Sequence, residues 1–178
     1  MAPRRLTLNA LLVALTVAAT LVIRVPTPAT QGYINLGDAV IFAAALLFGP
    51  RTGLLAGGLG SALADLLGGY VHWAPFTLVI KGLEGALVGL IFRGSLQAWL
   101  GVLIGCLAAC VGGAWMVFGY FLTESFLYGW QPAVATIPGN TVQALGSLLV
   151  GIPVAVALAR AGIGGRGTGE GPADSREP

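Results

Sequence analysis

Charged residues are scarce in this sequence. Asp, Glu, Lys and Arg make up only 9% of its 178 residues, whereas a soluble domain carries about 25%. Hydrophobic residues reach 56%, and the mean hydropathy is +0.87. Because too few polar side chains are present to cover a surface that faces water on all sides, we expect an integral membrane protein in a lipid bilayer.

Other shortages exclude further classes of protein. The net charge of +2 offers no basic surface for nucleic acid. Two cysteines, Cys106 and Cys110, are too few for a disulfide framework, and we interpret them as small packing residues rather than metal ligands. The single histidine, His72, has no partners for a zinc protease, a haem site or a Ser-His hydrolase. We therefore expect no enzymatic activity, no metal and no cofactor.

Six apolar segments are separated by glycine, proline and charged residues. They cover residues 6–23, 36–49, 52–69, 75–92, 96–122 and 134–160. We predict an all-α bundle of six transmembrane helices over residues 1–161, followed by a disordered tail over residues 162–178, which are rich in glycine, proline and charge. The first segment lacks a clear small-residue cleavage site, so we expect it to be retained. The second is short for a hydrocarbon core of ~30 Å, so segments two and three could instead form a re-entrant hairpin, leaving four crossings.

The basic residues predict the orientation of the bundle. One set of helix ends carries Arg4, Arg5, Arg51, Arg93 and Arg160, and the opposite set carries only Arg24. Because Lys and Arg are enriched in cytoplasmic loops, we predict that both termini are cytoplasmic. The loops over residues 24–36, 69–75 and 123–139 then face outward.

Four charged residues fall in the outer half of the predicted helices: Asp38, Asp65, Lys81 and Glu84. A charge near the middle of a bilayer costs about 2.5–3.5 kcal/mol on insertion scales, so such residues usually face a cavity or pair with one another. Lys81 and Glu84, spaced i, i+3, can form an ion pair. We infer an outward-facing polar pocket, in which the Lys81 ammonium would suit a ligand phosphate, carboxylate or carbonyl. The alternatives are a purely structural salt bridge and, for Asp38, capping of a helix N-terminus.

Aromatic and amide side chains gather at the same level. A wall for a flat heteroaromatic ligand could be formed by Tyr33, Tyr70, Trp73 and Phe76, together with Trp115 and Tyr120, although Tyr and Trp also populate ordinary membrane interfaces. Asn140 and Gln143 lie one helical turn apart and supply amide donors and acceptors. Helix capping or interhelical hydrogen bonding is the alternative role for this amide pair.

Small residues recur at helical spacing. Ala10, Ala14 and Ala18 form one stripe on the first predicted helix, where another helix could approach closely. The spacing does not distinguish a partner helix in the same bundle from one in another protein. Similar pairs occur in the later helices, namely Gly53 and Gly57, Gly85 and Gly89, and Gly101 and Gly105.

Three blocks within residues 23–89 resemble a known family. They are GYINLGDA, GSALADLL and APFTLVIKGLEG, at residues 32–39, 60–67 and 74–85. They are similar to the substrate-binding S component of energy-coupling factor (ECF) transporters of the riboflavin type. The resemblance implies a six-helix subunit that captures a vitamin or vitamin precursor on its outer face and docks on a transmembrane T component with two ATPases. The absence of a G-x-x-x-x-G-K-[ST] loop agrees with ATP hydrolysis in those partners.

The resemblance also implies roles for particular residues. S components hold their ligand with the loop after the first helix and the outer parts of helices four to six, which implies Tyr33, Asn35, Lys81, Glu84, Asn140 and Gln143. With the neighbouring polar and aromatic residues, the expected binding set is Tyr33, Asn35, Asp38, Asp65, Tyr70, Trp73, Lys81, Glu84, Asn140 and Gln143. The alanine-rich face of the first helix serves for docking in this family, which implies that role for Ala10, Ala14 and Ala18.

These expectations define a substrate-capture subunit of an ATP-driven vitamin importer in a prokaryotic plasma membrane. A riboflavin-like compound is the first guess, and pyridoxine or a thiamine-precursor pyrimidine fits the aromatic wall equally well. The alternative is a self-sufficient proton- or ion-coupled secondary transporter with Asp65, Lys81 and Glu84 as its relay. Against it, the inner half of the predicted bundle lacks polar groups for a path, and no inverted repeat is visible. A membrane scaffold without a ligand would leave the buried charges without a role.

Overall fold

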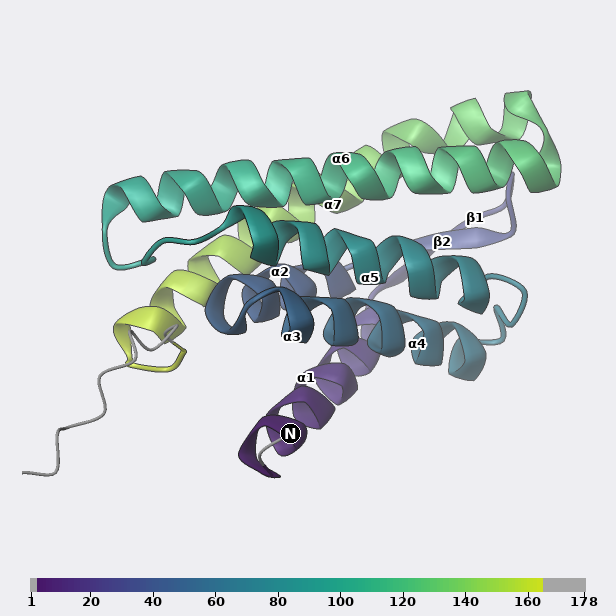
Figure 1. Ribbon diagram of the computed structural model, residues 1–178. Coiled ribbons are helices and arrows are strands. Elements are labelled where there is room, and N and C mark those ends of the chain that lie inside the picture. The colour runs from purple at the N-terminus through teal and green to yellow at the C-terminus, as the bar shows by residue number, and fades with distance from the viewer. Residues whose placement is uncertain (1–2, 165–178) are drawn as a thin grey trace, which may run out of the picture.

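Each of the six apolar segments forms helical structure in the computed structural model, which describes residues 3–164 (Figure 1). The helices are α1 (Pro3–Val22), α2 (Gly37–Phe48), α3 (Pro50–Leu55), η1 (Ala56–Gly60), α4 (Ser61–Gly68), α5 (Ala74–Ile91), α6 (Trp99–Tyr128) and α7 (Trp130–Arg160). Two short strands, β1 (Arg24–Thr27) and β2 (Gly32–Asn35), complete the described chain. The expectation of a mostly helical protein is confirmed.

The third apolar segment is one continuous helix that contains a π-helical turn. Residues at both junctions of η1, including Leu55 and Ser61, keep right-handed helical backbone angles, so α3, η1 and α4 follow one another without a break. The run begins with Gly49 and Pro50, which reverse the chain after α2. Gly49 has φ +92°, a conformation that favours glycine, and Pro50 is suited to the first helical position.

Four helices are long and apolar enough to cross a membrane: α1, α5, α6 and α7. Helix α2 has only 12 residues, and the run from α3 to α4 is divided by its π-helical turn. Six crossings and cytoplasmic termini therefore stay predictions.

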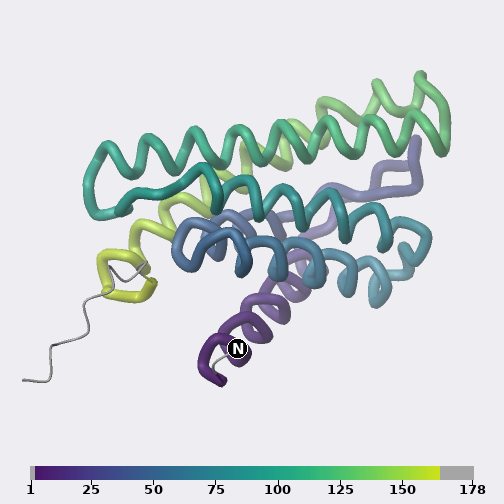
Figure 2. The backbone as a smooth tube through the Cα atoms, in the orientation of Figure 1, coloured from purple at the N-terminus to yellow at the C-terminus, as the bar shows by residue number. Residues whose placement is uncertain are grey.

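Helix α2 forms the centre of the bundle. Its side chains are buried almost without interruption from Gly37 to Leu47, since it packs against α1, α3, α5 and α7. Helix α6 runs along one side of the molecule, α7 starts beside its end and crosses behind it, and α1 lies at the opposite edge (Figure 2). The short apolar segment that seemed weakest in the sequence is thus the most enclosed helix.

The segment after α1 is a β-hairpin, where the sequence analysis predicted only a loop. Strands β1 and β2 pair antiparallel, with Arg24 opposite Asn35 and Thr27 opposite Gly32. The hairpin lies at the same end of the bundle as the turns from α4 to α5 and from α6 to α7 (Figure 1). The three segments predicted to share one end therefore do so.

The predicted outer loop over residues 123–139 is wrong. Helix α6 continues to Tyr128, and α7 begins at Trp130, with only Gly129, at φ +90°, between them. Pro132 lies in the first turn of α7, where a missing backbone N–H is harmless, and the helix also accommodates Pro138.

The predicted tail starts just after α7. The backbone N–H of Ile163 donates to the carbonyl of Leu158 over 2.9 Å, so the first tail residues close the helix end. The remainder of the predicted tail, residues 165–178, lies outside the described residues.

Two of the three glycine pairs pack helices closely, as predicted, whereas Gly101 meets the backbone of Ser95 in the preceding loop and Gly105 meets only side chains. A Cβ atom on Gly53 would collide with the backbone of Gly85, and one on Gly57 would collide with the carbonyl of Lys81. Gly89 approaches the backbone of Pro50 in the same way. The run from α3 to η1 therefore meets α5 at backbone contact distance, which fixes the position of Lys81.

The alanine stripe of α1 behaves differently. Ala10, Ala14 and Ala18 are all exposed, and α1 instead buries Thr16 and Thr20 against the bundle. A partner helix within the same bundle, which the spacing alone left open, is therefore excluded for this stripe.

An apolar core fills the end of the bundle opposite the hairpin. It is built from the last turns of α2 and α5 and the facing parts of α6 and α7, and it includes Phe42, Leu46, Val88, Phe92, Ala108 and Ile152. The four acidic side chains of the described residues all lie nearer the hairpin, and each is buried.

Candidate functional site

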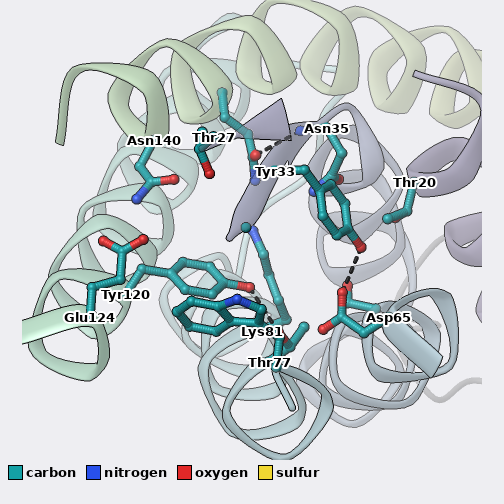
Figure 3. Close-up of a pocket in the computed structure, with 14 residues that line it drawn as sticks. Thr20, Thr27, Tyr33, Asn35, Asp65, Thr77, Lys81, Tyr120, Glu124 and Asn140 are labelled. Carbon is teal, nitrogen blue, oxygen red and sulfur yellow. Dashed lines mark hydrogen bonds between the residues drawn. The ribbon is translucent and has the colours of Figure 1, made fainter. Parts of the chain in front are cut away.

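A polar cavity lies beneath the hairpin, between β1, β2 and the adjoining parts of α1, α4, α5, α6 and α7 (Figure 3). It is lined by Thr20, Thr27, Gly32, Tyr33, Asn35, Ser61, Asp65, Trp73, Thr77, Lys81, Tyr120, Glu124, Asn140 and Gln143. Of the ten expected binding residues, Tyr33, Asn35, Asp65, Trp73, Lys81, Asn140 and Gln143 line it. Asp38 and Glu84 are buried beside Lys81 and do not line it, and Tyr70 is half-buried against Tyr33 outside it.

Lys81 is held by two carboxylates. Its Nζ atom lies 2.5 Å from Oδ1 of Asp38 and 3.1 Å from Oε2 of Glu84, and all three side chains are buried. Glu84 follows Lys81 by three residues, so both project from one face of α5. The predicted Lys81–Glu84 ion pair is confirmed. Asp38 adds a second carboxylate from the first turn of α2.

Gln143 connects this ionic group to the hairpin. Its Nε2 donates to Oδ2 of Asp38 over 2.8 Å, and its Oε1 accepts the backbone N–H of Asn35 over 2.7 Å. The interhelical hydrogen bonding considered for this amide is therefore present. It joins α7, α2 and β2 at the floor of the cavity.

The capping role considered for Asp38 is wrong. Its carboxylate bonds to Lys81 and Gln143, whereas the backbone N–H of Gly37 donates to Oδ1 of Asn35 over 2.8 Å. The Asn35 side chain thus binds the first backbone N–H of α2, and the Asp38 carboxylate binds the ammonium of Lys81 instead.

Asp65 belongs to a second polar group, on the hairpin side. The Tyr33 hydroxyl donates to Oδ1 of Asp65 over 2.6 Å, and the rings of Tyr33 and Tyr70 lie 4.6 Å apart. Burial, together with the adjacent Asp65 carboxylate, raises the pKa of Tyr33 well above its ordinary value. The hydroxyl therefore stays a donor. Among the described residues Asp65 forms no ion pair with Lys81 or any other cation.

Aromatic rings form one wall of the cavity. The rings of Trp73 and Tyr120 lie 5.8 Å apart, and Lys81 Nζ lies 5.6 Å from the centre of the Tyr120 ring. Trp73 is only 3% exposed, and its Nε1 donates to the carbonyl of Gln31 over 3.2 Å. Trp73 is thus an interior wall residue rather than part of an interfacial belt. The Tyr120 hydroxyl donates to Thr77 over 3.2 Å.

Glu124 is the charged lining residue that the sequence analysis missed. It lies near the end of α6, is only 4% exposed and accepts the hydroxyl of Thr136 on α7. Because residues 123–139 were expected to form a solvated loop, an acidic residue there attracted no attention. The signal was a single carboxylate close to an apolar run, where an unpaired charge is costly.

The remaining candidates lie outside the cavity. His72 is exposed, with Nε2 3.1 Å from the hydroxyl of Tyr128. Cys106 is half-buried, packs against the apolar core and forms no disulfide, and Cys110 is an exposed free thiol. Within residues 3–164, no group of three or more His, Cys, Asp or Glu side chains could hold a metal ion.

Several long apolar helices around a polar cavity beneath one end define a multi-pass membrane protein. Residues 1–160 match the family model described as ECF-type riboflavin transporter, S component, and the chain belongs to this family. The family is one of transporter subunits rather than enzymes.

Two relatives cover most of the chain. A protein of Pyrococcus woesei named "Uncharacterized protein in gap 3'region" is 46% identical over 132 residues, which are 74% of this chain and 86% of that protein. The "Thiamine precursor transporter HmpT" of Lactococcus lactis subsp. cremoris is 33% identical over 161 residues, 90% of each chain. A shorter match, 40% identical over 80 residues, is to a UPF0397 protein of Streptococcus pneumoniae.

Proposed function

We propose that this chain captures a small heteroaromatic vitamin or vitamin precursor in the cavity beneath the hairpin, as the S component of an ATP-driven importer. The observation that carries the proposal is the one-sided placement of polarity. Ionic and hydrogen-bonding groups line the cavity, while the opposite end is filled by an apolar core that includes Phe42, Val88 and Phe92. Such a site can bind a polar molecule, but it offers that molecule no polar route through the protein.

The proposed membrane topology has six crossings. Helix α2 begins directly after the hairpin and runs towards the other end of the bundle. The run from Pro50 to Gly68 packs antiparallel to α5 and returns towards the hairpin end. Arg51 and Arg93 lie at helix ends opposite the hairpin. The preference of basic residues for the cytoplasm then places both termini inside and the cavity outside a prokaryotic plasma membrane.

The exposed alanine stripe of α1 supports docking on another membrane protein. Ala10, Ala14 and Ala18 present a smooth surface on which a second helix can lie closely. We assign to this surface the contact with a transmembrane T component, which in turn carries two ATPases.

Riboflavin and a thiamine precursor are two candidate ligands for the site. The family model is described for riboflavin, whereas the relative from Lactococcus lactis that covers 90% of both chains is named for a thiamine precursor. Both kinds of molecule are flat, nitrogen-rich rings that suit the wall formed by Trp73 and Tyr120. The proposal therefore names a small heteroaromatic vitamin or precursor, with riboflavin as one member of this class.

Two measurements test the proposal. Mass spectrometry of small molecules that co-purify with the protein should detect a heteroaromatic vitamin or precursor. In liposomes, the purified chain should bind this compound without transporting it, and uptake should require the T component, the ATPases and ATP. Unaided uptake driven by an ion gradient would instead establish a secondary transporter with Asp65, Lys81 and Glu84 as relay candidates.

A further inference from the structure

The cavity contains more carboxylates than cations. Its lining includes the acidic residues Asp65 and Glu124 and the basic residue Lys81. The ammonium of Lys81 is already neutralised by Asp38 and Glu84, at 2.5 Å and 3.1 Å. This pairing argues against the idea that Lys81 holds a phosphate or carboxylate of the ligand, because an anion would enter beside unbalanced carboxylates.

Glu124 is placed to act on a ligand. Its carboxylate is buried, lines the cavity and receives a neutral hydroxyl group, that of Thr136. No basic side chain within the described part of the chain forms an ion pair with it. A buried carboxylate without a cation is unfavourable unless further donors reach it, so this side chain is suited to an incoming N–H group.

Asn140 provides a second, independent sign of a ligand at this position. It is 8% exposed, lines the cavity and makes no hydrogen bond through its side chain with any residue in the range 3–164. Figure 3 shows its amide and the Glu124 carboxylate on one side of the cavity, across from Tyr33 and Asp65. Buried amides are almost always hydrogen-bonded in folded proteins, so an unused amide aimed into a cavity points to a missing partner.

We propose that Glu124 is a specificity-determining residue that accepts a hydrogen bond from an N–H group of an unphosphorylated, uncharged or cationic heteroaromatic ligand. Asn140 pairs with an adjacent polar atom of the same ring edge, and Trp73 and Tyr120 contact its faces. The inference rests on the proposed function and deepens it. The carboxylate selects N–H donors and rejects phosphate esters, because a phosphate would face like charges without a free cation.

The test is isothermal titration calorimetry on the purified full-length protein with four probes. These are riboflavin, a hydroxymethyl aminopyrimidine and the phosphate ester of each. The variants are Glu124→Gln, which keeps the size of the side chain but removes its charge, and Thr123→Val as the matched control. Thr123 is the neighbouring residue on α6, and its hydroxyl donates to the carbonyl of Gly119 within the same helix over 2.9 Å.

We expect the wild-type protein to bind at least one unphosphorylated probe at least about tenfold more tightly than its ester. Glu124→Gln should weaken that binding about tenfold to a hundredfold, the range expected when a hydrogen bond to a charged group is lost. It should also reduce the discrimination against the ester. Thr123→Val should bind as the wild type does, and the ligand-free melting temperature of Glu124→Gln should not fall, since an unpaired buried charge is removed.

Three outcomes would contradict these statements in distinguishable ways. Unchanged affinity in Glu124→Gln, or equal binding of a probe and its ester, would overturn the role of Glu124 and leave vitamin capture standing. Failure of the wild-type protein to bind any of the four probes, pyridoxine or any heteroaromatic compound that co-purifies with it would overturn both proposals.

Discussion

The ammonium of Lys81 on α5 lies 2.5 Å from Oδ1 of Asp38 on α2, 43 positions earlier in the chain. This contact joins α2, the central helix of the bundle, to α5, which packs through glycine residues on the run from α3 to η1. Because Gln143 bonds to the other oxygen of the same carboxylate, three helices meet at Asp38. Stability and ligand capture are therefore coupled at this point.

Removal of the lysine should damage both properties. Lys81→Met leaves Asp38 and Glu84 buried without their cation, and the loss of one partner from a buried pair costs about 3–5 kcal/mol. We expect a lower melting temperature and strongly weakened ligand binding. Arg93→Met, at an exposed arginine, is the control and should change neither. A stable, binding-competent Lys81→Met protein would show that the ion pairs matter for neither property.

The double variant Lys81→Met/Asp38→Asn separates the two effects. Neutralising Asp38 removes one unpaired charge, so part of the lost melting temperature should return. Binding should stay weak if Lys81 itself touches the ligand. A double variant that is no more stable than Lys81→Met would mean that charge burial is not the cause of the destabilisation.

Close packing around η1 gives a second prediction. Gly57→Ala would push a methyl group into the carbonyl of Lys81, which should cost about 1–3 kcal/mol through overpacking and shift the lysine. Gly146→Ala on α7 is the matched control, because no atom lies within 4 Å of its added Cβ. The control should be unchanged or more stable by about 0.5–1 kcal/mol. Thermal unfolding in detergent compares them, and equal melting temperatures for the two variants would argue against the tight interface.

A substitution on the exposed stripe of α1 should prevent docking on the T component without changing ligand binding. Ala14→Trp adds a bulky ring to an exposed stripe, so ligand affinity should be preserved while uptake by the assembled importer is lost. Ala135→Trp, at an exposed alanine of α7 on the hairpin side, is the control and should support normal uptake. Uptake assays in cells and calorimetry on purified protein measure the two properties. Normal uptake by Ala14→Trp would remove the docking assignment.

The hairpin should loosen when its bond to α4 is lost. Tyr33→Phe removes the 2.6 Å hydrogen bond to Asp65, and a bond of this charged kind contributes about 1.5–3 kcal/mol. Amide hydrogen exchange of residues 24–35 should become faster, while exchange in α6 should not change. Protection equal to that of the wild type would show that the contact does not hold the hairpin.

The Tyr33–Asp65 hydrogen bond predicts that the hydrogen-exchange protection of the hairpin depends little on pH. The pKa of Tyr33 is raised by burial and by Asp65, so the hydroxyl keeps its proton at every pH below the ordinary tyrosine value of 10.0. The contribution of this tyrosine to stability is complete below that value and is lost only as the pH rises through the higher folded pKa. Hairpin protection should therefore be constant across neutral and mildly alkaline pH, once exchange rates are corrected for their intrinsic pH dependence. Loss of protection near neutral pH would contradict this assignment.

The sequence predicted some features well because they are local. Apolar runs between glycine, proline and charge located the helices, and the i, i+3 spacing of Lys81 and Glu84 predicted their ion pair. The hairpin and the outer ends of α6 and α7 were missed. Short strands carry a weak pattern, and Pro132 and Pro138 resemble loop residues although α7 contains both.

Partners from distant parts of the chain were harder to predict. Asp38 and Asp65 were both expected among the binding residues, but the sequence did not determine which of them pairs with Lys81. Asp38 forms that ion pair, and Asp65 bonds to Tyr33. Nothing in the spacing of single residues states which helices become neighbours. Glu124 was missed for the same reason, because its role depends on the cavity that distant parts of the chain form around it.

By itself, the sequence determined that the chain is a helical membrane protein with Asp38, Asp65, Lys81 and Glu84 in one half of its predicted helices, since hydrophobicity and charge act on each segment separately. The tertiary structure alone decided which acid meets which base, that α2 is the central helix and that the alanine stripe of α1 is left uncovered. Those outcomes depend on close contacts between backbones, such as Gly53 with Gly85, that bring residues far apart in the chain to within hydrogen-bonding distance.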